Sequence, residues 1–143
     1  MKKILTFAFT VLFYHGMTAQ KIEIDSLIKN LNNSQLHGTC HYVWVIEMES
    51  KEADSLISIG KSITNKLIPL LDNPEKGIII HCVLSRIWND SIDVESSTEN
   101  YKSKGVVEYI YNELKFYEKD GKIMADQIEL IENKKKWLEK INE

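Results

Sequence analysis

The chain has 143 residues, of which 43% are hydrophobic and 27% charged, and its net charge at pH 7 is −3. This composition excludes a disordered chain, because aliphatic and aromatic residues are frequent enough to build a core. The acidic balance argues against a nucleic-acid-binding protein, which needs clustered positive charge. The basic run at 134–136 lies between Glu132 and Glu139, so we expect it to be a solvated helix face.

The first nineteen residues have the order of a secretory signal peptide. Lys2 and Lys3 precede an apolar run over 4–14, and small residues precede a cleavage point near Ala19. The run is shorter than the ~20 apolar residues that a membrane-spanning helix needs. We therefore expect an exported protein, periplasmic or secreted, with no membrane attachment after cleavage. Residues 20–143 are expected to form a single globular domain.

The first half of that domain, residues 22–88, is expected to be helical. Apolar residues spaced i, i+3, i+4 and i+7 predict an amphipathic helix over 22–32. The apolar segment 42–48 fits either a helix or a strand, and we favour a helix because helical sequence follows directly. Ser50 is expected to cap the next helix, which Gly60 ends.

Two further helices are predicted from the apolar pattern. The first covers 62–72 and contains Pro69, which should kink it because proline cannot donate a backbone hydrogen bond. Asn73 and Pro74 suit the start of the second, which should reach Trp88. That helix is apolar on most sides, so we expect it to be buried at the centre of the domain.

A family resemblance lies in the same stretch. The sequence Gly-Lys-Ser-Ile-Thr-Asn-Lys-Leu-Ile-Pro-Leu-Leu-Asp-Asn-Pro at 60–74, followed by the apolar helix, resembles a HEAT-type helical repeat. The resemblance covers 50–88, and Asn65 occupies the place of the usual proline. A solenoid needs ~3 or more repeats, so one unit implies local HEAT-like packing. Because HEAT-type repeats generally bind proteins, the resemblance implies a protein partner.

The second half changes periodicity. Residues 89–104 are expected to form a polar loop, and alternation over 106–125 predicts a small antiparallel meander. The Asp-Gly pair at 120–121 indicates a hairpin turn. A capping pattern at Asp126 predicts a last helix over 126–142. The predicted fold class is α+β, mainly α-helical with HEAT-like hairpin packing, with a β-meander before the C-terminal helix.

Five residues of the mature chain carry metal-binding or thiol chemistry: His37, Cys40, His41, His81 and Cys82. Thiolates and imidazoles are the usual zinc ligands, so a metal site is one interpretation. In an oxidising compartment Cys40 and Cys82 can instead form a disulfide, worth ~4 kcal/mol on the chain-entropy model. A pair of unreactive buried thiols is the third interpretation. The disulfide is favoured, and we expect no cofactor.

Four aromatic residues have two interpretations: Tyr109, Tyr111, Tyr117 and Trp137. As core residues they would join the small sheet to the last helix, which is the favoured interpretation because a small sheet must bury one face. As outward residues they would form an aromatic binding surface, since Tyr and Trp are enriched at interfaces.

A catalytic motif is missing from the sequence. Cys40 and His41 are adjacent, but adjacent residues on a helix point about 100° apart, and no local motif supports a nucleophile–base pair. We therefore expect an exported, non-catalytic binding or accessory protein of unknown specificity, whose partner is another protein. The alternative is a small metal-binding protein or hydrolase that uses the His/Cys cluster.

Overall fold

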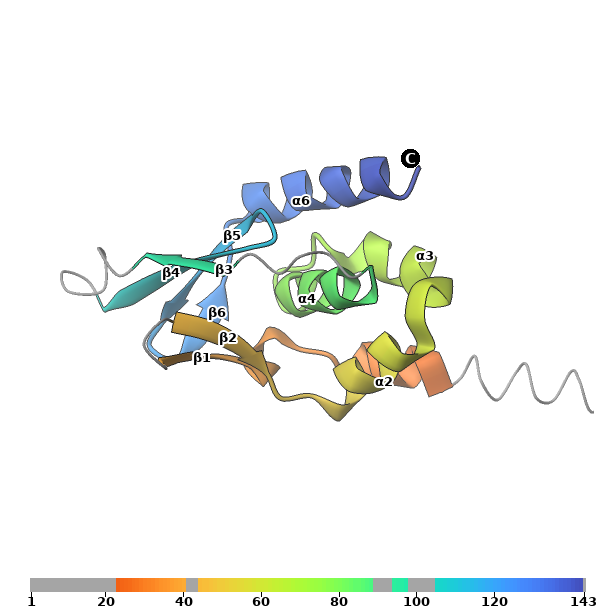
Figure 1. The fold of residues 1–143 in the computed structure, drawn as a ribbon, viewed down its shortest axis with the longest axis horizontal. Helices are drawn as coiled ribbons and strands as arrows, with labels where there is room; N and C mark the ends of the chain where they lie inside the picture. The colour runs from red at the N-terminus through yellow and green to blue at the C-terminus, as the bar shows by residue number, and fades with distance from the viewer. Residues whose placement is uncertain (1–22, 41–43, 89–93, 98–104, 143) are drawn as a thin grey trace, which may run out of the picture.

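The structure, a computed structural model, describes residues 23–40, 44–88, 94–97 and 105–142 (Figure 1). The predicted signal peptide lies outside these residues. The mainly helical α+β class is confirmed, with helices gathered at one end of the molecule and two antiparallel sheets at the other. Within the described part of the chain, no helix combines the length and apolarity needed to cross a membrane.

The N-terminal part contains a hairpin in place of a predicted helix. Residues 23–30 are helical as expected. After η1 (Asn33–Gln35) the chain forms β1 (Leu36–Cys40) and β2 (Trp44–Met48), which pair antiparallel. The helix favoured for 42–48 is therefore wrong over Trp44–Met48, and the region 22–88 is not entirely helical. The β-branched residues of this apolar run suit a strand, and pairing with β1 decides between two states that periodicity alone leaves open.

The next helix follows the prediction, and the one after it is broken. α2 (Lys51–Ile59) begins at Ser50, whose Oγ accepts a 3.2 Å hydrogen bond from the Ala53 amide. The predicted helix over 62–72 is divided into η2 (Gly60–Ile63), α3 (Thr64–Leu67) and η3 (Ile68–Leu70). Pro69 lies in η3 and lacks the N–H that a continuous helix would need there. The resemblance of this stretch to a HEAT-type repeat stays a prediction.

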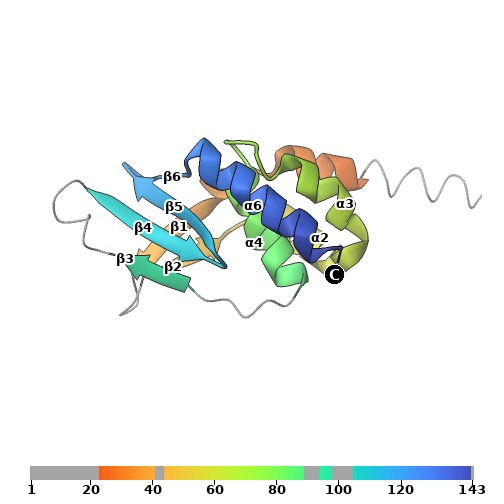
Figure 2. The same cartoon turned by 90° about the horizontal axis from the view of Figure 1, so that it is seen from above.

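The central helix, α4 (Gly77–Ile87), is buried as predicted but begins later. Asn73 and Pro74 form a turn, in which the Asn73 carbonyl accepts a 2.7 Å hydrogen bond from the Gly77 amide. Ten of the eleven residues of α4 are buried. It contacts α2, α3, η1, η3 and β5, and α6 lies over it in both views (Figures 1 and 2).

The larger sheet confirms the meander and corrects the loop. Its order is β3-β4-β5-β6, antiparallel throughout, with the strands β3 (Val94–Ser97), β4 (Val106–Tyr111), β5 (Leu114–Lys119) and β6 (Lys122–Met124). The loop predicted over 89–104 thus contains a strand, because β4 offers a free edge for pairing. Asp120 and Gly121 have φ values of +52° and +72°, which the predicted two-residue turn requires.

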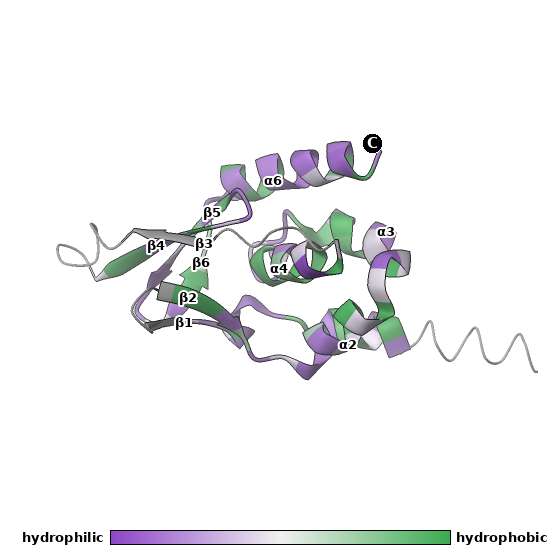
Figure 3. Cartoon of the chain, in the orientation of Figure 1, coloured by the Kyte–Doolittle hydropathy of each residue, from purple (hydrophilic) through white to green (hydrophobic). Residues whose placement is uncertain are grey.

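The last helix, α6 (Gln127–Lys140), lies over α4 and is mostly hydrophilic, whereas α4 is mostly apolar (Figure 3). Its N-cap is Asp126, but the Asp126 side chain makes no capping hydrogen bond, so the predicted capping box is not formed. Leu130 and Trp137 bury its inner face. Lys134 Nζ donates 2.9 Å hydrogen bonds to Pro69 O and Asp72 Oδ2, and these join α6 to the segment before α4.

Candidate functional site

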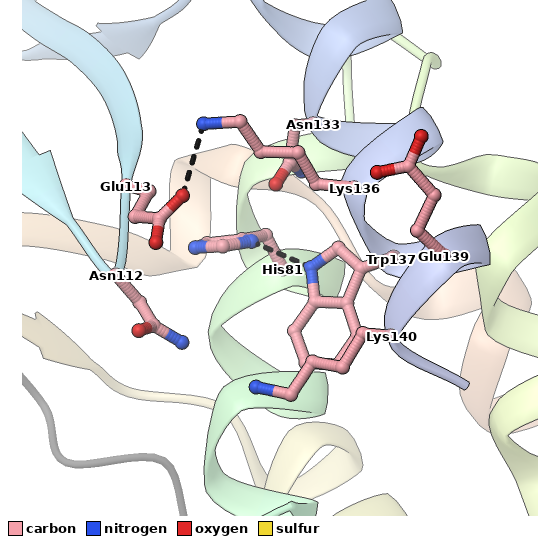
Figure 4. A pocket seen from close by; sticks show the side chains of 8 residues that line it. All are labelled: His81, Asn112, Glu113, Asn133, Lys136, Trp137, Glu139 and Lys140. Carbon is pink, nitrogen blue, oxygen red and sulfur yellow. Dashed lines mark hydrogen bonds and ion pairs between the residues drawn. The ribbon is translucent and has the colours of Figure 1, made fainter. Parts of the chain in front are cut away.

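A pocket of about 220 Å³ lies between α6, α4 and the turn that joins β4 to β5 (Figure 4). Its floor is aromatic, and its walls carry amides and charges of both signs. The lining residues are His81, Asn112, Glu113, Asn133, Lys136, Trp137, Glu139 and Lys140. Most of them come from two elements distant in sequence, so the pocket exists only when α6 is docked.

The floor of the pocket is a buried hydrogen-bonded pair. Trp137 Nε1 donates to His81 Nδ1 at 2.9 Å, and His81 Nε2 lies 2.8 Å from the Tyr111 carbonyl oxygen. An indole N–H can only donate and a carbonyl can only accept. His81 is therefore neutral, with its proton on Nε2. Both ring nitrogens are hydrogen-bonded within the protein, so this structure does not offer His81 as a metal ligand.

One wall of the pocket is the two-residue β4–β5 turn. Asn112 and Glu113 have φ values of +47° and +69°, a region that few residues other than glycine adopt. Asn112 Nδ2 donates to Ser85 Oγ of α4 at 3.0 Å. Glu113 Oε2 accepts a 3.0 Å hydrogen bond from Lys136 Nζ across the mouth of the pocket. The turn is thus held from two helices, which fixes the shape of the wall.

The opposite wall contains an unsatisfied donor. Asn133 is 5% exposed, and its Nδ2 is the one buried side-chain nitrogen or oxygen of the described residues that has no hydrogen-bond partner. Leaving such a group unpaired costs about 1–3 kcal/mol. The Lys140 ammonium, on the same helix, lies 5.2 Å from the centre of the Trp137 ring. An acceptor atom that reached this nitrogen from the pocket would satisfy the amide, among lining groups of both charges.

Cys82 is a free thiol at the centre of α4, and it is 2% exposed. Burial raises the pKa of this thiol to about 12, and the nearby Arg86 opposes the shift. The Cys82 thiol is therefore a poor nucleophile and a poor metal ligand. The structure holds Cys82 unbonded, and the side chain of Cys40 lies outside the described residues. A Cys40–Cys82 disulfide stays a prediction that a thiol count decides.

The aromatic residues proposed as a binding surface are mainly core. Tyr109, Tyr111 and Trp137 are 0%, 3% and 4% exposed, so the surface interpretation is wrong for these three. Tyr117 is half-buried. Tyr109 stacks on Phe116 with ring centres 5.5 Å apart. Alternation along β4 explains the arrangement, because Tyr109 and Tyr111 share the inner face while Ile110 points outward.

His37 lies on the β1–β2 hairpin and does not line the pocket beneath α6. It pairs across the strands with Glu47, and its Nε2 is 3.4 Å from Glu47 Oε2 and 3.8 Å from Glu49 Oε1. These three side chains are the one group of metal-ligating atoms found together in the described ranges. All three are well exposed to water, where such ion pairs contribute little. His41, the other histidine of the predicted cluster, lies outside the described residues.

Of the lining residues, the sequence predicts a site role for His81, as a possible metal ligand, and for Trp137, as a possible aromatic surface, and it does not predict the others. Asn112 and Glu113 separate two alternating runs by two residues, which is the spacing of a tight hairpin, so that signal was present. Asn133 and Lys136 look like ordinary polar residues of an amphipathic helix. No sequence pattern shows that one is buried without a partner and the other reaches the turn.

Comparison with known proteins gives no assignment: no protein-family model matches the chain, and neither does any curated protein or solved structure.

Proposed function

We propose that this chain is an exported, non-catalytic binding protein whose pocket beneath α6 holds a small carboxylate. The observation that carries the proposal is the unpaired Asn133 Nδ2 in the wall of that pocket. A carboxylate oxygen would accept the hydrogen bond that this amide lacks, and charge-assisted bonds of this kind are the stronger ones.

The remaining lining supports an anionic and small ligand. Lys136 and Lys140 lie on the same wall as Asn133, so a carboxylate would meet two ammonium groups, in a lining where Glu113 already pairs with Lys136 and Glu139 is a second acid. The volume of about 220 Å³ is below the ~300–1,000 Å³ typical of sites for drug-sized molecules. A molecule of the size of a single amino acid or a short organic acid fits these limits.

Two features support binding over catalysis at this site. A nucleophile or base must have a free reactive atom within reach of the substrate. The His81 ring nitrogens are engaged by Trp137 and the Tyr111 carbonyl, and the Cys82 thiol is buried in α4. The hydrolase and metal-protein alternative, which relied on a joint His/Cys cluster, loses support because His81 and Cys82 are core residues.

The proposal is tested by NMR titration of the purified protein with acetate and N-acetylglycine, using glycinamide as a probe that lacks a carboxylate. We expect the Asn133 side-chain amide, the Trp137 indole and the Lys136 backbone to shift with the two carboxylates only. Asn133→Leu keeps the size of the side chain and removes the amide, so it should abolish these shifts. The fold of this variant should be at least as stable, because it loses an unsatisfied buried donor.

Asn142→Leu is the matched control, because Asn142 is an exposed amide just after α6 and does not line this pocket. This variant should bind both probes as the wild type does. Equal shifts with Asn133→Leu, or no shifts with any carboxylate, would contradict the proposal.

A further inference from the structure

Three side chains with metal-ligating atoms share one face of the β1–β2 hairpin. His37 of β1 pairs across the strands with Glu47 of β2, and Glu49 follows two residues further along the chain. The Glu49 amide donates a 3.0 Å hydrogen bond to the Gln35 carbonyl, which extends the pairing of the two segments as far as Glu49. Residues two apart on a strand point to the same side. Both carboxylates therefore lie beside the imidazole ring of His37.

The ligating atoms are spaced as the ligands of one ion would be. His37 Nε2 lies 3.4 Å from Glu47 Oε2 and 3.8 Å from Glu49 Oε1, and one ligating atom of each residue lies within 4.8 Å of the other two. Nitrogen and oxygen ligands lie about 2.0–2.2 Å from zinc, which puts tetrahedral neighbours roughly 3.4 Å apart. The Glu49 side chain is 78% exposed, so it can rotate to close the remaining gap.

The Glu47 carboxylate is already oriented toward this point. Thr39 Oγ1 donates a 3.0 Å hydrogen bond to Glu47 Oε1, while Glu47 Oε2 faces His37. Outer hydrogen bonds of this kind commonly hold metal-bound carboxylates in place. Two carboxylates beside a neutral imidazole also carry two negative charges, which a divalent cation balances.

We propose that His37, Glu47 and Glu49 bind one Zn²⁺ ion, with water in the remaining position. Zinc accepts nitrogen and oxygen ligands together, whereas Mg²⁺ and Ca²⁺ prefer oxygen ligands alone. Such an ion would join β1 to the end of β2. The site shares only His37 with the His/Cys cluster considered from the sequence, and it needs neither cysteine.

Titration of the purified protein, without a histidine tag, with zinc chloride tests this proposal by calorimetry and NMR. We expect one ion per chain, with the largest shifts at the His37 ring and the hairpin amides, and no such shifts with magnesium chloride. Thr39→Val keeps all three ligands but releases the Glu47 carboxylate, so it should weaken binding about tenfold. His37→Gln and Glu49→Gln each remove a ligand, and each should weaken binding by more than that.

Glu132→Gln is the matched control for the loss of one carboxylate, since Glu132 is exposed on α6 and does not belong to the group. Cys40→Ser is the control for a thiolate ligand. Both variants should bind Zn²⁺ as the wild type does, and their NMR spectra show whether the hairpin is intact.

The absence of saturable Zn²⁺ binding would overturn the proposal and leave the three side chains as exposed ion pairs. Binding that Cys40→Ser abolishes and Glu49→Gln leaves unchanged would also overturn it, because the ion would then be held by a thiolate. His37, Glu47 and Glu49 do not line the pocket beneath α6, and the chloride salts supply no carboxylate. The carboxylate proposal therefore stands or falls separately.

Discussion

At the residue scale, the hydrogen bond from Trp137 to His81 joins α6 to α4 in the buried centre of the molecule. Trp137→Phe keeps an aromatic ring but removes the donor, which leaves His81 Nδ1 without its partner. We expect the free energy of unfolding to fall by about 2–4 kcal/mol, from the unpaired nitrogen and the lost ring volume. Urea denaturation measures this change.

Trp88→Phe is the control for loss of an indole donor. Trp88 Nε1 donates to the Thr64 hydroxyl at 3.2 Å, but Trp88 is half-buried and water can replace the bond. The loss there should be about 1 kcal/mol. Equal losses of free energy at the two tryptophans would show that the buried bond to His81 stabilises the fold no more than the half-buried bond of Trp88.

The ¹⁵N chemical shifts of the His81 ring should also report a neutral ring protonated on Nε2.

The raised pKa of the Cys82 thiol makes the stability of the fold depend on pH in the alkaline range. Burial raises its pKa from an ordinary 9.0 to about 12. Between these values the unfolded chain has released the proton while the folded chain keeps it, so rising pH favours unfolding. The contribution of Cys82 is therefore complete below pH 9.0 and is lost progressively toward pH 12. Burial also raises the pKa of Tyr111, which acts in the same direction.

We therefore expect the free energy of unfolding to fall less steeply above pH 9.0 in Cys82→Ala than in the wild type. Denaturant titrations at several alkaline pH values measure the two slopes. The native thiol should also resist modification at neutral pH and react once urea unfolds the chain. With Cys82 unbonded, unfolding without reductant should expose two thiols per chain. If the wild type and Cys82→Ala lost stability equally with rising pH, and the unfolded wild type had no free thiols, a Cys40–Cys82 disulfide would be established instead.

At the element scale, the two sheets approach each other at Gly38 of β1. A Cβ atom there would overlap the hydroxyl of the buried Tyr109 on β4 and lie 2.6 Å from Glu118 Oε2. Gly38→Ala should therefore destabilise the fold by about 1–3 kcal/mol, a typical cost of overpacking. Tyr109→Phe alone should cost about 1 kcal/mol, because it breaks the 3.1 Å hydrogen bond to Glu118.

The double variant separates overlap from other causes. Removal of the Tyr109 hydroxyl takes away the nearest of the three crowding atoms and frees the Glu118 carboxylate, which lies 2.6 Å from the new methyl group, to rotate away, so Gly38→Ala should cost less in the Tyr109→Phe background. A double-mutant cycle from denaturant unfolding gives the coupling. Simple addition of the two losses would show that β1 shifts as a whole and that the hydroxyl does not limit its position.

The elements that the sequence predicts well are those with a local physical cause. Ser50 caps α2, and the Asp-Gly pair at 120–121 forms the turn between β5 and β6. Each of these signals acts within a few residues. Residues 42–48 and β3 could not be assigned in the same way, since strand formation there depends on pairing with distant residues. The pocket depends on tertiary structure even more, because the burial of Asn133 results from the packing of α6 and leaves no mark in the local sequence.

At the scale of the whole molecule, α4 is the element around which the others are assembled. The hairpin and α2 lie on one side of it, α6 lies on the other, and the larger sheet closes one end (Figure 1). A helix buried on nearly all sides cannot exchange its amide protons until its neighbours leave. The outer elements differ, since β1 and β2 form a two-stranded sheet with several half-exposed side chains.

Native-state hydrogen exchange should therefore find the slowest amides in α4, with protection equal to the global free energy of unfolding, and faster exchange in the β1–β2 hairpin. Trp137→Phe should lower the protection of α4 and α6 together, by the same free energy that it removes from global stability, because the two helices share the buried Trp137–His81 bond. A variant that frees α6 while α4 keeps its full protection would show that α6 is a separate unit laid over an independent core. In that case the pocket beneath α6 would open without unfolding the protein, and its ligand would bind by closing α6 against α4.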